Sequence, residues 1–112
     1  MASYSVDPGD PDASYLSFWR EKHLCTLTTL RPDGTPHVVP VAVTYDPGAR
    51  LARVVANGSS TKVRHVRAVV SAERERVAEA ERRYAERYGR TPRPNPARVV
   101  IEIALTRALG RG

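Results

Sequence analysis

The stretch LCTLTTLRPDGTPHVVPVAVTY, residues 24–45, decides the fold class of this chain. Residues 24–30 are rich in Thr and residues 37–45 are rich in Val, so both runs predict β-strands. Between them, the segment Arg31-Pro32-Asp33-Gly34-Thr35 predicts a tight turn, because Pro presets φ and Asp-Gly favours a sharp bend. The stretch therefore predicts a β-hairpin.

The segment that follows extends this hairpin. Residues 46–48, Asp-Pro-Gly, predict a second turn, and residues 51–56 predict a third strand. Three strands with short connections form an antiparallel meander. Pro40 lies inside the second strand and has no N–H group, so we expect an open edge, a bulge or a ligand beside it.

Two helices are expected around the strands. Asp12 is a suitable N-cap for a short helix over residues 13–20, in which Leu16 and Trp19 share a face that can dock on apolar surface. Ser71 is a suitable N-cap for a longer helix that runs to residue 88. Its apolar face is formed by Val77, Ala80, Tyr84, Ala85 and Tyr88. We expect its Glu- and Arg-rich face to be solvated.

The remaining segments complete a mainly β fold with helices. Residues 68–70 predict a strand fragment, and residues 99–105 predict the last strand. With 112 residues the chain is expected to form one domain over residues 13–112, preceded by a flexible tail over residues 1–12 that is rich in Pro, Gly and Asp. Neither a signal peptide nor a membrane-spanning run is recognisable, so we expect a cytoplasmic protein without a membrane partner.

The net charge of +6 comes almost entirely from Arg and favours anionic partners, although an Arg-biased composition would produce the same charge. A nucleic-acid binder usually exposes aromatic side chains among its basic residues, whereas here Trp19, Tyr84 and Tyr88 belong to helix faces. We therefore expect no nucleic-acid partner, and a smaller anion is the kind of ligand that the charge favours.

Residues 57–62, NGSSTK, are the candidate anion site. Small residues leave backbone N–H groups accessible, the Ser and Thr hydroxyls add donors, and Lys62 adds a positive charge. Lys62 is one of two lysines, with Lys22, in a chain that has 18 Lys and Arg residues. The segment lacks the spacing of a P-loop, and an ordinary polar turn remains the alternative.

The sequence shows no candidate residues for catalysis by side chains of the kinds that the common enzyme classes use. The histidines at positions 23, 37 and 65 lack metal-ligand spacing, Cys25 is the single cysteine, and no G-x-S-x-G motif occurs, so we expect no metal site. We expect any reaction to depend on a bound cofactor.

Three segments together resemble a known family: HLCTLTTLRPDGTPHVVPVAVTYDP (residues 23–47), LARVVANGSSTKVRHVR (51–67) and YAERYGRTPRPNPARVVIEI (84–103). They resemble the flavin/deazaflavin oxidoreductases with the pyridoxamine 5'-phosphate oxidase-like, FMN-binding split β-barrel. Within that family they look most like the branch that uses coenzyme F420, in particular the actinobacterial F420-dependent biliverdin reductases. The resemblance covers about residues 13–109.

The resemblance implies a cofactor that lies across the barrel at a homodimer interface. It implies that the cofactor phosphate is held by Ser59, Ser60, Thr61 and Lys62, that the ring lies along His37, Val39, Pro40 and Val41, and that Val55, Ala56 and Asn57 back the cofactor. The implied reaction is hydride transfer between reduced F420 and a small conjugated acceptor, such as a biliverdin-like tetrapyrrole.

The chain departs from the family pattern at one point. Members carry about two further strands between the positions that match Arg67 and Ala68, which are adjacent here. Two alternatives stay open. One is an FMN-binding oxidoreductase of the same fold, and the other is a non-catalytic cofactor-binding protein, which the missing strands favour.

Overall fold

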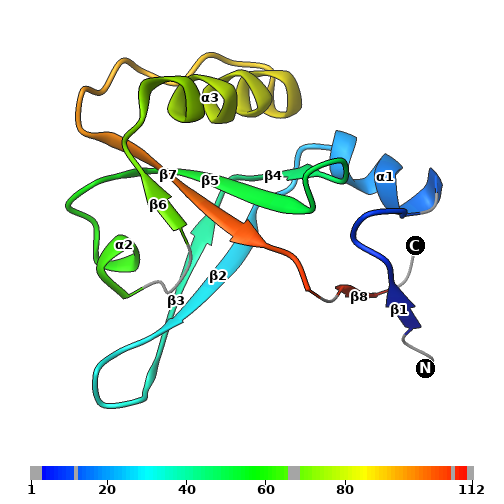
Figure 1. Ribbon diagram of the computed structural model, residues 1–112, viewed down its shortest axis with the longest axis horizontal. Helices are drawn as coiled ribbons and strands as arrows, with labels where there is room; N and C mark the ends of the chain where they lie inside the picture. The colour runs from blue at the N-terminus through cyan, green and yellow to red at the C-terminus, as the bar shows by residue number, and fades with distance from the viewer. Residues whose placement is uncertain (1–3, 12, 66–68, 107, 111–112) are drawn as a thin grey trace.

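The computed structural model describes residues 4–11, 13–65, 69–106 and 108–110, and these form eight strands and three helices (Figure 1). The strands make a four-stranded sheet and two separate two-stranded sheets. The expectation of a mainly β protein with helices is therefore confirmed.

The predicted hairpin is present. Strands β2 (Cys25–Leu30) and β3 (Pro36–Val41) pair antiparallel along their whole length. In the turn, the Arg31 N–H donates to the Thr35 carbonyl at 2.9 Å, and the Thr35 hydroxyl donates to the Asp33 carboxylate at 2.7 Å. This hydroxyl bond is the main cause of the lowered pKa of Asp33.

The single strand expected over residues 37–45 is wrong in one respect. The chain leaves β3 after Val41, and β4 (Val43–Asp46) begins after Ala42 in a different sheet, where it pairs with β5 (Leu51–Asn57). The meander is thus two hairpins joined by a bend at Ala42.

Contacts of Val43 explain this bend. The Val43 N–H donates to the Tyr88 hydroxyl at 3.2 Å, and Nη1 of Arg87 donates to the Val43 carbonyl at 2.6 Å. Because side chains of the long helix bind both backbone groups of Val43, these groups do not extend the ladder with β2.

The four-stranded sheet forms the centre of the molecule, in the order β4-β5-β7-β6 with antiparallel neighbours. Strands β7 (Arg98–Ala104) and β6 (Val69–Ser71) correspond to the two C-terminal strands expected from the sequence. One face of this sheet and the inner face of the β2–β3 hairpin enclose the core, whose buried members are Val41, Val43, Ala52, Val54, Ala56 and Ile101.

The opposite face of the sheet is covered by α3 (Arg74–Tyr88), as Figure 1 shows. The helix ends at Gly89 and uses the expected apolar face, in which Ala80 is buried. It begins at Arg74 and not directly after Ser71, because Ser71 pairs with Val100 of β7 as part of β6.

Four further elements, two short helices and two short strands, lie outside the central sheet. Helix α1 (Ala13–Arg20) was expected, whereas the short helix α2 (Thr61–His65) was not. Strand β1 (Tyr4–Val6) pairs with β8 (Ala108–Gly110), so part of the segment expected to be a flexible tail is in a sheet. Strand pairing of the two chain ends is a long-range contact that a local reading of residues 1–12 does not show. The domain boundary at residue 13 stays a prediction.

Candidate functional site

The predicted phosphate-binding residues follow β5 directly: Ser59 and Ser60 lie before α2, and Thr61 and Lys62 are its first two residues. These four residues are hereafter called the 59–62 turn. Asn57, the last residue of β5, shapes it: its side-chain oxygen accepts hydrogen bonds from the Ser59 N–H at 3.0 Å and from the Ser59 hydroxyl at 2.8 Å. The Ser60 N–H donates to the Asn57 carbonyl at 3.0 Å. Several donors that the sequence suggested for a ligand are therefore used to build the turn.

The turn lies directly against the loop that precedes β7. The Gly58 N–H donates to the Ala97 carbonyl at 2.9 Å, and a Cβ atom at position 58 would lie 3.1 Å from that oxygen. Glycine is thus favoured here by close backbone approach. This contact fixes the start of α2 relative to the central sheet.

Two polar groups of the turn have no partner among the described residues. The Ser60 hydroxyl is buried and has no hydrogen-bond partner within the described part of the chain. Lys62 is partly buried and forms no ion pair with a described residue. A hydroxyl and, two residues later, an ammonium group that both lack a described partner are donor types that suit a phosphate or carboxylate.

The predicted ring-binding residues of β3 divide between two faces of the hairpin. The inner face carries His37, Val39 and Val41, and the outer face carries Pro40. The edge expected at Pro40 is confirmed for the described strands, since β3 pairs with β2 alone. Pro40 costs no ladder hydrogen bond there.

The predicted site residues at the end of β5 also lie on two different faces of their strand. Ala56 is buried in the core with Val41, and Val63 of α2 packs against that core. Val55 lies on the face of β5 that also carries Arg53, whose ion partner Asp46 binds Arg83 of α3. The structure therefore brings the inner face of β3, the end of β5 and α2 together, and it separates Val55 and Pro40 from them.

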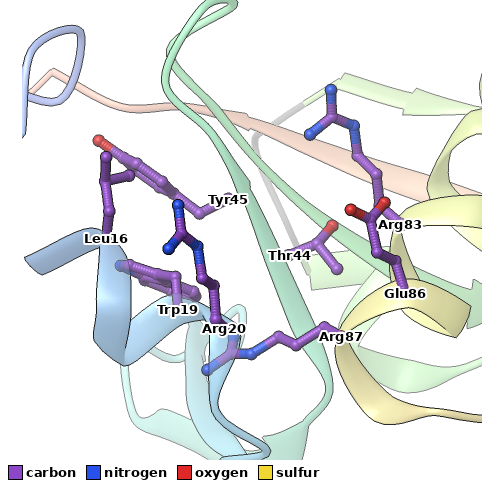
Figure 2. Close-up of a pocket in the computed structure, with 8 residues that line it drawn as sticks. All are labelled: Leu16, Trp19, Arg20, Thr44, Tyr45, Arg83, Glu86 and Arg87. Atoms are coloured by element: carbon purple, nitrogen blue, oxygen red, sulfur yellow. The ribbon is translucent and has the colours of Figure 1, made fainter. Parts of the chain in front are cut away.

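A pocket that the sequence did not suggest lies between α1, β4 and α3 (Figure 2). Arg87 of α3 lines this pocket and is only 6% exposed. The Glu- and Arg-rich face of this helix was expected to be solvated, so the burial of Arg87 differs from that expectation. The spacing in the sequence could have indicated this burial. Arg87 is seven residues after Ala80 and three after Tyr84, so it lies on the same helix face as these two residues.

The described residues hold no group of His, Cys, Asp and Glu side chains that is suited to a metal ion. None of the helices in the described part of the chain has the length and apolar character that a bilayer crossing requires.

Comparison with known proteins identifies a relative. The chain is 44% identical over 116 residues to the F420H(2)-dependent biliverdin reductase of Mycobacterium tuberculosis (strain CDC 1551 / Oshkosh), and the match covers 85% of this chain and 84% of that protein. No family model matches the sequence.

Proposed function

Since this chain belongs to the family of the F420H(2)-dependent biliverdin reductase, we propose that it is an oxidoreductase that uses coenzyme F420 to reduce a conjugated organic acceptor. The identity of 44% over most of both chains is the observation that carries this proposal. A biliverdin-like tetrapyrrole is the first candidate for the acceptor.

The 59–62 turn fits the phosphate of the cofactor. The unsatisfied Ser60 hydroxyl and the unpaired Lys62 supply two donors, and Ser59 and Thr61 flank them. Asn57 supports the turn through its bonds to Ser59 and is not itself required as a phosphate ligand. A charge-assisted contact of this kind contributes about 1.5–3 kcal/mol.

The hairpin supplies the wall along which the cofactor ring would lie. His37 and Val39 are partly exposed on the inner face, and Val41 and Ala56 are buried behind them. Pro40 and Val55 lie on the other faces of β3 and β5, so within one subunit they do not join this wall, and Asn57 ends β5 next to the 59–62 turn. The residues of the wall orient the ring and exclude water, while bound reduced F420 supplies the hydride.

The chain departs from the family pattern at residues 67 and 68, and we attribute this departure to the loss of about two strands from a split barrel. The alignment with the relative extends over 116 residues, which is more than the 112 of this chain, so the relative has positions that this chain lacks. Strand β6 is an edge strand, and Val69 on it is 55% exposed. The mass of the intact protein tests whether this junction is real.

A homodimer is the assembly that we infer for this protein. The outer face of the β2–β3 hairpin exposes 61% of Leu30 and 56% of Val38, with Pro36 and Pro40 beside them. Adjacent apolar side chains of this kind are typical of protein interfaces. A second subunit would cover them.

Fluorescence titration of F420 tests the proposal directly. We expect saturable binding of F420 by the purified protein, weaker binding of FMN, and oxidation of reduced F420 when biliverdin is added. The absence of saturable F420 binding at micromolar concentrations would contradict the proposal.

A variant makes the test specific to the turn. Ser60→Ala removes a hydroxyl that has no partner in the structure, so we expect unchanged thermal stability but weaker F420 binding. Ser17→Ala, which changes an exposed serine of α1, is the matched control and should bind F420 like the wild type.

A further inference from the structure

A cavity of about 210 Å³ lies between α1, β4 and α3, and Figure 1 places these elements away from α2 and the 59–62 turn. The cavity is lined by Leu16, Trp19, Arg20, Thr44, Tyr45, Arg83, Glu86 and Arg87 (Figure 2). None of these residues belongs to the proposed F420 site.

The most unusual member is Arg87, a cation that is 6% exposed. Its Nε donates to the Glu21 carbonyl at 2.9 Å and its Nη1 donates to the Val43 carbonyl at 2.6 Å. Its Nη2 is buried and has no acceptor among the described residues. A buried donor without an acceptor is costly and calls for a partner.

Aromatic rings surround the same guanidinium but do not supply that partner. Figure 2 shows Arg87 extending from α3 toward Trp19 of α1, and its Cζ lies 4.6 Å from the centre of the Trp19 ring. The rings of Phe18 and Tyr88 lie 5.8 and 5.3 Å away. These contacts stabilise the charge partially, but they accept no in-plane hydrogen bond from Nη2.

Some of the charged side chains that line the cavity have an oppositely charged partner and others do not. Arg83 contacts the Asp46 carboxylate at 3.1 Å, and Glu86 contacts Arg82 at 3.3 Å, so each has an opposite charge as a partner. No carboxylate among the described residues pairs with Arg87 or with Arg20. The cavity therefore carries positive charge that no described residue neutralises.

Trp19 provides a second, independent observation. Its Nε1 is also buried and has no hydrogen-bond partner in the described part of the chain. Two residues that line one cavity thus carry unsatisfied N–H donors, and an acceptor is the group that both need. A water molecule would accept such a bond but would leave the charge of Arg87 uncompensated.

We propose that this cavity binds an oxyanion, the carboxylate or phosphate group of a small ligand, which Arg87 and Arg20 hold. Oxyanions accept several hydrogen bonds and match the planar guanidinium group. The volume of about 210 Å³ suits inorganic phosphate or a small carboxylic acid. The site acts independently of the F420 site, so failure of either proposal leaves the other in place.

Trp19 supplies the readout, because it is the single tryptophan of the chain and lines the cavity. The full chain without F420 is titrated with phosphate, with acetate and with chloride at constant ionic strength. We expect a saturable change of tryptophan emission with phosphate or acetate and none with chloride. The arm that saturates at lower concentration identifies phosphate or carboxylate as the preferred group.

Variants assign the response to the cavity. Arg20→Gln, in an exposed side chain, should weaken anion binding about tenfold, which corresponds to about 1.4 kcal/mol. Arg93→Gln changes another exposed arginine and should have no effect, and Lys62→Ala should also leave the emission change intact. Arg87→Lys keeps the charge but loses the planar fork, so it should weaken binding if the variant retains the wild-type melting temperature.

Four outcomes would overturn the proposal. The first two are an equal response to chloride and no saturable response to either oxyanion. The third is a response that Arg20→Gln leaves unchanged, which would place the bound anion elsewhere on the chain. The fourth is loss of the response in Lys62→Ala, which would place the anion at the 59–62 turn.

Discussion

The two functional proposals depend on two cations, Lys62 and Arg87. The side chains of these residues differ in burial and in their hydrogen-bond partners. Lys62 is partly buried in the first turn of α2 and forms no described ion pair, whereas Arg87 is buried between α3 and α1 and donates to two backbone carbonyls. An accessible cation can be replaced with little damage to the fold, but a buried one contributes to it. The tests of the two residues therefore differ.

Replacing Lys62 tests the F420 site at residue scale. We expect Lys62→Ala to weaken F420 binding by about 1–3 kcal/mol, because one charge-assisted contact to the phosphate is lost. Binding by the wild type should also weaken as salt rises, since the contact is partly exposed. Fluorescence titration measures both effects.

Lys22 is the matched control for this experiment, because it is exposed and lies near Gly89 at the end of α3, away from the turn. Lys22→Ala should bind F420 like the wild type. Equal affinities for the wild type and both variants would remove the 59–62 turn from the cofactor site.

The ionisation of Asp46 is tied to the fold, because its partners come from β5, the β4–β5 turn and α3. Burial alone would raise the pKa of its carboxyl group, but hydrogen bonds from Arg53 and from the Ala49 N–H, with the nearby charge of Arg83, lower it below the ordinary value of 3.8. A lowered folded-state pKa stabilises the protein above the unfolded pKa, and this stabilisation disappears as pH falls through the folded pKa.

We therefore expect Asp46→Asn to reduce the free energy of unfolding at pH 7 by about 1–3 kcal/mol, because the side chain of Arg53 is 10% exposed and loses its nearer carboxylate at 2.9 Å, which leaves only Glu102 at 4.0 Å among the described carboxylates. Between pH 5 and pH 3 the wild type should lose more stability than the variant. Urea unfolding at several pH values measures both quantities. Parallel stability curves for the two proteins would show that Asp46 does not cause the acid sensitivity.

At the scale of elements, α3 connects the proposed anion site to the fold. Its apolar face covers the central sheet, its last turn carries Arg87, and Glu79 binds Arg82 and Arg83 on its outer side. These two hydrogen bonds lower the pKa of Glu79 to about 2, so the outer ion pairs persist in moderate acid. The helix end is defined by Gly89, in the left-handed region with φ of 72°.

The C-cap of α3 gives a prediction at this scale. Gly89→Ala places a Cβ atom on a residue with positive φ, so we expect a loss of about 1 kcal/mol in the free energy of unfolding. Urea unfolding measures it. Gly48→Ala is the control, because Gly48 does not have positive φ, and it should cost less. A loss in Gly89→Ala no larger than in Gly48→Ala would show that the left-handed cap contributes little to stability.

At the scale of the whole molecule, the β2–β3 hairpin stands apart from the central sheet. Figure 1 shows it projecting from the side of the sheet opposite α3. Only its inner face packs on the core, and its outer face exposes Leu30 and Val38. A hairpin covered on one side is incompletely buried, and a second subunit would complete its packing.

Light scattering tests this assembly. We expect the wild type to be a dimer at micromolar concentration and Val38→Glu to be a monomer, because a carboxylate would be buried in the interface. Ala49→Glu, in the exposed turn between β4 and β5, is the control and should remain a dimer. A monomeric wild type that still binds F420 would contradict the inference.

Local patterns in the sequence were sufficient for most of the elements. The Pro-Asp-Gly turn, the β-branched runs and the period of the long helix predict the hairpins, β7 and α3, because turn chemistry and side-chain alternation act over a few residues. The family was also visible in the sequence. The individual residues of the F420 site remain predictions, although the structure shows which of them lie together.

Only the tertiary structure decided where the elements interact. The bend at Ala42 depends on Tyr88 and Arg87, which lie more than 40 positions away, and β1 finds its partner at the other end of the chain. The burial of Arg87 depends on α1 and β4 closing around it. Such contacts arise when distant segments pack, so no local pattern contains them, and the second anion site becomes visible only in the folded chain.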